Sequence, residues 1–274
     1  MNTNPMIVAR RSWNVAASGT LTQQDGTTNA LYPVSRAVDR DPATATKSTT
    51  TDDYALQWDW TSPQRVDAVW IPMYNMPAGT VVHFQLDAGA SWAGSPATAP
   101  TVDATVTVPA YGGDLPRGLF LNITEAAGYS ASGFRYGRLY VPNPSQVTAI
   151  GDVFIASQVA TVPNILIGAT RPRGRAVTMH QRNDGGYFKY DRGHGTWQVN
   201  GRVYTDADEF EDYLALFEDA RGSLYPFAIV INVDEANPEG YVVQWEGEFS
   251  PSNMFIDHEE LSFTWQMVPR GRAL

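Results

Sequence analysis

Residues 205–233 read TDADEFEDYLALFEDARGSLYPFAIVINV, and they hold the strongest helix signal in the chain. Thr205 or Asp206 can serve as the N-cap, with Asp208 or Glu209 three positions on completing a capping box. Apolar residues then recur at i, i+3, i+4 and i+7 as one stripe, namely Phe210, Tyr213, Leu214 and Phe217. The apolar run FAIVINV follows and is typical of a buried strand. The stretch predicts one acidic helix, residues 206–221, packed on a β-sheet.

The first 160 residues carry short segments of alternating hydrophobicity, such as YALQWDW, RVDAVWIPMY and TVVHFQLDA. About eight such segments at roughly ten-residue spacing, without a helix pattern, are typical of a β-sandwich or jelly roll. The series closes near residue 160, and Pro163 follows. We therefore predict a mainly β protein with two domains: a jelly-roll β-sandwich over residues 1–160 and a β-sandwich with one flanking helix over residues 161–274.

Composition excludes several classes of protein. Hydrophobic residues make up 43% of the chain and charged residues 18%, as in a globular protein. The formal net charge of −10 argues against nonspecific binding to nucleic acid or to an anionic membrane. The chain has no cysteine, which excludes disulfides and thiolate metal sites. The first residues lack the apolar run of a signal peptide, so we expect synthesis in a cytosol without secretion and no insertion into a membrane.

Motifs of catalysis are absent from the sequence. None of the four histidines has the spacing of a zinc motif, and no nucleophile elbow, phosphate loop or dinucleotide fingerprint is present. Asp39 and Asp41 lie in a long polar loop and could hold Ca²⁺ together with backbone carbonyls, but ordinary Asx turns are the favoured explanation. We expect a protein that is not an enzyme and needs no cofactor.

Two sets of residues are candidates for binding. Trp92 and Tyr111 could stack on a sugar ring, or could equally fill gaps between loops. The second set pairs a basic segment with the acidic face of the predicted helix, as a contact between subunits, and comprises Arg171, Arg173, Arg175, Glu211, Asp212 and Glu218.

The first half resembles the galactose-binding-like jelly roll of discoidin domains. The residues that carry the resemblance are Ala37–Thr44 (AVDRDPAT), Trp58, Val66–Ile71, Tyr136–Leu139 and Ile150–Ile155, in the order that the family shows. The disulfide that often joins the ends of extracellular members is absent. The resemblance implies a module able to recognise glycan.

The second half resembles the tail-tube and distal-tail domains of long-tailed phages. A basic hairpin, a strand, a D-x-x-E-F helix and closing strands with YVV and LSFTW follow in that order. The resemblance implies a structural virion protein of the distal tail or baseplate, forming a ring, as a hexamer or trimer, at the tail tip. Its neighbours would be the tail tube, the tape-measure protein and tail-hub or baseplate proteins. DNA would pass the channel without specific binding.

The alternative function is carbohydrate binding, in which the jelly roll recognises a glycan on the host surface and the rest of the chain is a spacer. For the tail-tip protein we expect assembly in the host cytoplasm and a place in the virion.

Overall fold

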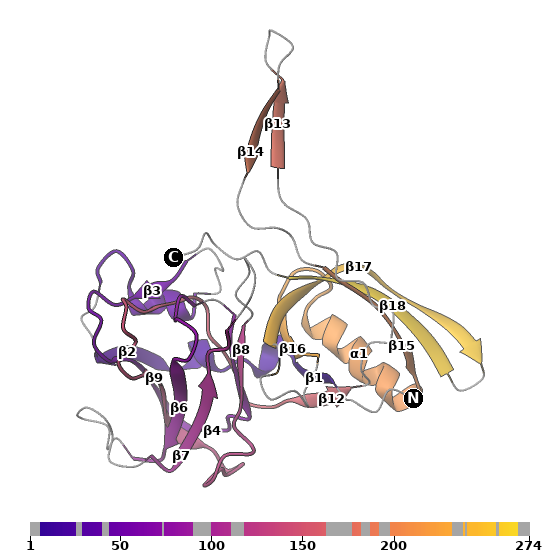
Figure 1. Cartoon of the computed structure of the whole chain (residues 1–274). Helices are drawn as coiled ribbons and strands as arrows, with labels where there is room; N and C mark the ends of the chain where they lie inside the picture. Colours follow the sequence, from indigo (N-terminus) through magenta and orange to yellow (C-terminus); the bar gives the residue numbers. More distant parts are fainter. Residues whose placement is uncertain are drawn as a thin grey trace.

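The structure is a computed structural model, and it describes residues 6–25, 29–39, 44–72, 74–89, 100–110, 118–162, 177–181, 187–191, 198–231, 238, 240–255 and 258–267. The described chain consists of antiparallel strands, three short 3₁₀ turns and one α-helix, so the predicted mainly β class is confirmed. Figure 1 shows a sandwich in indigo to magenta beside a curved sheet in orange and yellow that carries the helix.

The larger sheet of the sandwich has five antiparallel strands. In spatial order they are β2 (Thr20–Asp25), β4 (Tyr54–Gln64), β9 (Phe134–Val141), β6 (Val81–Asp87) and β7 (Val102–Thr107). Alternation along β4 explains the burial, because Leu56 and Trp58 are inaccessible whereas Gln57 and Asp59 between and beyond them are partly exposed. The indole Nε1 of Trp58 also donates to the carbonyl of Ala16 at 3.0 Å. The central strands therefore place their large rings in the core.

A second sheet lies across this core. It comprises β11 (Phe154–Ala156), β5 (Ala68–Ile71) and β8 (Leu119–Asn122), and a small ladder joins β3 (Thr46–Lys47) to β10 (Ala149–Ile150). Val69, Ile71 and Leu121 point from this sheet into the same apolar cluster as Trp58. The two sheets with a shared core form the β-sandwich that the sequence predicts for the first half.

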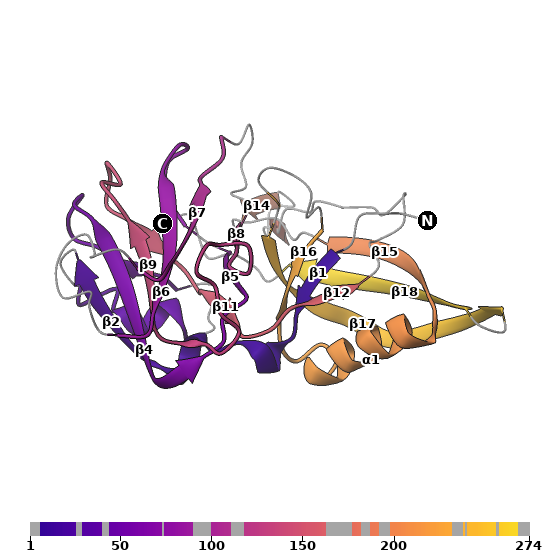
Figure 2. The same cartoon turned by 90° about the horizontal axis from the view of Figure 1, so that it is seen from below.

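The other large sheet has six strands and includes the N-terminal strand. Its order is β12 (Ala160–Val162), β1 (Met6–Ala9), β16 (Phe227–Val230), β17 (Gly240–Phe255), β18 (His258–Met267) and β15 (Gln198–Thr205). Figure 2 shows indigo β1 among the orange and yellow strands. β12 begins at residue 160, and β1, which the prediction placed in the first domain, pairs with β16 of this sheet. The chain thus enters the sandwich from β1 and returns through β12, which is the neighbour of β1.

Helix α1 (Ala207–Asp219) covers one face of the six-stranded sheet, close to the predicted range 206–221. Asp206 is the N-cap and forms the capping box with Glu209, one of the two predicted pairings. A Schellman turn ends the helix, because the amide of Gly222 donates to the carbonyl of Phe217 at 3.0 Å. Both ends therefore follow from signals in the sequence.

The buried face of α1 differs in part from the predicted stripe. Tyr213 and Leu216 are fully buried, whereas Phe210, Leu214 and Phe217 are half-buried. The Phe217 ring meets that of Trp245 edge-on, with 5.3 Å between centroids. The helix rests on aromatic rings of β17 and β18, and Leu216 belongs to the same apolar cluster.

The opposite face of the six-stranded sheet packs against the sandwich. The apolar cluster at this junction combines residues of both parts, namely Ile7, Ala9, Ala68, Trp70, Phe120, Phe154, Ala156, Ala228, Val230 and Val242. The indole Nε1 of Trp70 donates to the carbonyl of Ile229 across the junction at 3.2 Å. An apolar junction of this kind holds two parts in a fixed orientation.

A separate hairpin, β13 (Val177–Gln181) and β14 (Tyr187–Asp191), projects from the body in Figure 1. Among the described residues, no helix combines the length and apolarity needed to cross a membrane.

Candidate functional site

Two arginine–aspartate pairs lie at one end of the sandwich, where β4 ends and β5 begins. We call this region the polar corner and define it by six residues: Asp59, Thr61, Arg65, Asp67, Tyr129 and Arg135. Gln64 of β4 is paired with Phe134 of β9, which brings the segment before β5 next to the segment before β9. Gly133 permits this approach: a Cβ atom there would lie 2.9 Å from the Arg65 backbone nitrogen. Its φ of +90° is also one that glycine adopts without strain.

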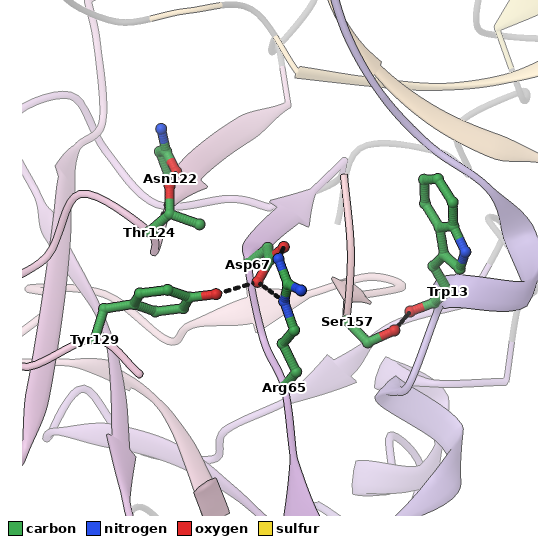
Figure 3. A network of polar contacts seen from close by, with 7 residues as sticks. All are labelled: Trp13, Arg65, Asp67, Asn122, Thr124, Tyr129 and Ser157. Carbon is green, nitrogen blue, oxygen red and sulfur yellow. Dashed lines mark hydrogen bonds and ion pairs between the residues drawn. The ribbon is translucent and has the colours of Figure 1, made fainter. Parts of the chain in front are cut away.

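Asp67 is the buried anchor of the first pair. Its side chain is 1% exposed and accepts from Arg65 Nε at 2.8 Å and from Arg65 Nη2 at 2.7 Å. The Tyr129 hydroxyl donates to the same carboxylate at 2.5 Å (Figure 3). The hydrogen bond to Asp67 raises the pKa of Arg65, and burial, followed by the contact with Asp67, raises the pKa of Tyr129. The hydrogen bonds from Arg65 and Tyr129 satisfy this buried carboxylate, which in turn fixes both side chains in place.

The backbone of Asp67 ties the corner to its surroundings. Its amide donates to the carbonyl of Ala156 at 2.8 Å, and its carbonyl accepts from Ile123 at 2.9 Å. Figure 3 shows the polar groups on either side of this strand: Asn122 and Thr124 on one, Ser157 and Trp13 on the other. Arg65 therefore projects from a segment that is held on both edges, and its own side chain is still 46% exposed.

Asp59 and Arg135 form the second pair at the surface. Arg135 donates to both oxygens of Asp59, from Nε at 3.0 Å and from Nη2 at 3.1 Å. The amide of Thr61 adds a third hydrogen bond, at 2.8 Å, to Oδ1. The bonds from Arg135 and then from Thr61 hold the pKa of Asp59 below its usual range, and the pKa of Arg135 is raised by Asp59. The side chains are 34% and 43% exposed, so solvent reaches this pair.

The corner presents hydrogen-bonding groups that are held rigid and face water. Among the described residues, the Nη1 group of Arg135 has no hydrogen-bond partner, and the guanidinium plane is set by two bonds to Asp59. Each arginine is matched by one carboxylate, so these four residues add no net charge. Such a surface can hydrogen-bond a polar ligand without the cost of ordering its side chains on binding.

The structure describes neither of the two residues predicted to contact glycan, Trp92 and Tyr111. The segment that contains Trp92 follows the end of β6. The last residue of β6, Asp87, is paired with Tyr136, the residue after Arg135. The segment of Tyr111 follows the other end of the same hairpin, where Thr107 is opposite Val81. The anchors of the two segments lie at opposite ends of the sandwich.

The predicted subunit contact is described only on its acidic side, because Arg171, Arg173 and Arg175 lie outside the described residues. Glu211 and Glu218 are exposed on α1. Asp212 pairs with Arg10 of the same chain at 3.3 Å, and Asp219, about two turns further along the helix, accepts from the amide of Ser12 at 2.9 Å. Part of the acidic face is thus used within the chain, by the segment that leads from β1 into the sandwich.

Of the two loop carboxylates considered for Ca²⁺, Asp39 has a protein partner. Asp39 accepts from the Thr44 hydroxyl at 2.8 Å, and Asp41 lies outside the described residues. Within the described part of the chain, no three acidic, histidine or cysteine side chains gather as a metal site would require.

Sequence reasoning missed the polar corner. Arg65 and Asp67, two positions apart, were visible only as ordinary strand residues, although an arginine and an aspartate at i and i+2 in an extended segment lie on one face and can pair. Tyr129 and Arg135 come from a distant segment. No local sequence pattern predicts their hydrogen bonds to Asp67 and Asp59.

Comparisons with known proteins give no family: no family model matches the chain, and no curated protein matches it. Solved structures that are similar to part of it include a chitosan-binding module 1 from a Paenibacillus sp. IK-5 chitosanase/glucanase, with 19% identity over 54% of this chain and 98% of that one, at a TM-score of 0.37. The lectin binding domain of lectinolysin has 16% identity, coverage of 54% and 97%, and a TM-score of 0.38. CBM62 from Clostridium thermocellum Xyl5A has 16% identity, coverage of 50% and 92%, and a TM-score of 0.34. These are structures of carbohydrate-binding or lectin domains by name, and their likeness extends over about half of this chain.

Proposed function

We propose that this protein binds carbohydrate through its first sandwich, with the polar corner as the contact surface, and that it is a binding protein and not an enzyme. The observation that carries the proposal is Arg135. Its planar guanidinium group is held in one orientation by Asp59 and is nearly half exposed. Its Nη1 has no hydrogen-bond partner among the residues that the structure describes. A sugar presents hydroxyl groups that accept and donate hydrogen bonds, and a rigid planar donor beside a carboxylate suits pairs of such groups. The discoidin-like order of motifs in the sequence supports the same function.

The balance of charge at the polar corner predicts how glycan binding depends on salt. Asp59 and Arg135 cancel, as do Arg65 and Asp67. A ligand held here by hydrogen bonds should therefore be released only weakly by salt, because screening acts on net charges.

Replacing Arg135 with alanine is expected to lower the affinity for the bound glycan at least about tenfold, because a fixed donor to the ligand is worth roughly 1.5–3 kcal/mol when charged. The fold should tolerate the change, since the ion pair is solvent-exposed and such pairs contribute little to stability. A glycan array on the intact protein identifies the ligand, and isothermal titration calorimetry measures the affinity.

Arg36→Ala is the matched control. Arg36 lies over the Tyr32 ring, and the Tyr32 carbonyl accepts from Thr46 of β3. Thr46 in turn bonds to Tyr54, at the start of β4, whereas the polar corner lies at the end of β4. This variant should bind as the wild type does. An array on which the wild type binds nothing, or an Arg135→Ala variant that keeps full affinity, contradicts the proposal.

A structural role at a phage tail tip is the second candidate function, and the exposure of Glu211 and Glu218 on α1 leaves room for the predicted contact with a neighbouring subunit. A glycan-binding sandwich on such a ring would contact the host surface. Lysine at both positions is expected to abolish rings that the wild type forms, because like charges would face the basic segment. Mass photometry of both proteins checks this. A wild type that is monomeric at all concentrations, or rings that persist in the variant, excludes the acidic face as an assembly surface.

A further inference from the structure

Thr61 adopts a strained backbone conformation at the polar corner. Its φ is +64°, in the left-handed region. Three other non-glycine residues of the described chain share a positive φ, Asn143, Ser145 and Arg221, and Thr61 alone among the four is β-branched. A branched Cβ meets the following carbonyl in this conformation, at a cost of roughly 1–2 kcal/mol. Glycine would form the same turn without that cost.

The strained turn at Thr61 positions the Asp59–Arg135 pair of the polar corner. The regular pairing of β4 with β9 breaks between Asp59 and Gln64, and Thr61 lies in this irregular segment. Its conformation aims its amide at Asp59, which in turn sets the plane of Arg135. Thr61 itself is exposed, so its side chain does not belong to the core. Strain of this kind persists where the surrounding structure imposes it, and it gathers at binding sites.

We propose that Thr61 is a positioning residue of the carbohydrate site: the stiff, strained turn fixes Asp59 and thereby holds Arg135 in its binding geometry. The inference rests on the proposed function. The surrounding structure imposes this conformation, and a branched side chain leaves the backbone fewer alternatives than glycine does. The turn therefore keeps one conformation when the ligand is absent. The strain lowers the free energy of unfolding, and in return the guanidinium group of Arg135 is already ordered before the ligand binds.

The test is Thr61→Gly in the full-length protein, with affinity and stability measured together. The variant should melt about 2–4 °C higher, the shift expected for relief of about 1 kcal/mol in a protein of this size. Its affinity for the glycan should fall about fivefold, because Arg135 must now be ordered on binding. A residue that served stability alone would change the melting temperature and leave the affinity unchanged.

Asn143→Gly is the matched control. Asn143 also has a positive φ, is exposed and donates its amide to an aspartate, Asp53, at 2.8 Å. Asp53 lies at the start of β4, away from the corner. This variant should bind the glycan as the wild type does. A Thr61→Gly variant with unchanged affinity, or with no gain in melting temperature, overturns the inference.

A second measurement separates this inference from the proposed function. Nuclear magnetic resonance follows the hydrogen exchange of the Arg135 Nε–H without any ligand. Thr61→Gly should accelerate this exchange about tenfold, and Asn143→Gly should leave it unchanged. Unaltered exchange in Thr61→Gly refutes the positioning role even if the protein binds carbohydrate. Accelerated exchange in a protein that binds no glycan supports the positioning of Arg135 and refutes only the function proposed for it.

Discussion

Replacing Trp70 with alanine is expected to lower the free energy of unfolding by about 3–5 kcal/mol, the range for removing a fully buried large aromatic residue. Trp70 is inaccessible to solvent, and its ring lies 4.9 Å from that of Phe120 and 5.9 Å from that of Phe154, measured between centroids. The substitution also removes the hydrogen bond to the carbonyl of Ile229. Chemical denaturation followed by circular dichroism measures the loss.

The position of Trp70 between the two sheets predicts how the substitution affects the coupling of their unfolding. Trp70 belongs to β5 of the sandwich, whereas Ile229 belongs to β16 of the six-stranded sheet. We therefore expect the wild type to unfold in one calorimetric transition and the alanine variant to show two, because the junction no longer couples the parts. Val81→Ala, on an exposed position of β6, should change stability by less than about 0.5 kcal/mol. A single transition in Trp70→Ala with stability near that of the wild type contradicts the coupling.

Local signals in the sequence predicted helix α1 well. The N-cap, the capping box and the glycine at its end are determined by neighbouring residues, so Asp206, Glu209 and Gly222 could be assigned without a structure. The strands of the sandwich were predictable for the same reason: alternation along β4 reflects one buried face.

The arrangement of these elements was not predictable from local signals. Nothing in MIVA distinguishes a strand of the sandwich from one that pairs with residues more than two hundred positions away, yet β1 pairs with β16. Leu216, which is buried in the same cluster as Trp245, was left out of the predicted stripe because the sheet beneath the helix decides which helical positions are buried. The polar corner depends on the same kind of distant partner, since Arg135 of β9 bonds to Asp59 of the neighbouring strand β4.

Deletion of residues 1–10 is expected to unfold the six-stranded sheet, although the sequence-based division places these residues in the other domain. β1 lies between β12 and β16 and pairs with both. Met6 and Val8 are buried in the core beneath α1, and Ile7 and Ala9 lie in the junction. Burying three of these side chains, Met6, Ile7 and Val8, contributes about 5–9 kcal/mol at roughly 1.5–3 kcal/mol each. That is comparable to the whole stability of a domain, about 5–15 kcal/mol.

The same pairing predicts that residues 161–274, expressed alone, do not fold cooperatively. The division at residue 160 predicts the opposite, because a complete domain folds by itself. Far-ultraviolet circular dichroism and thermal unfolding of this fragment distinguish the two outcomes, and deletion of residues 1–5, which precede β1, is the control for the loss of a terminus. A cooperative transition in the isolated fragment would show that β1 is dispensable. If the fragment is unfolded and a peptide of residues 1–15 added in trans restores structure, the missing strand is the cause, since the peptide supplies the pairing surface for β16 without the sandwich.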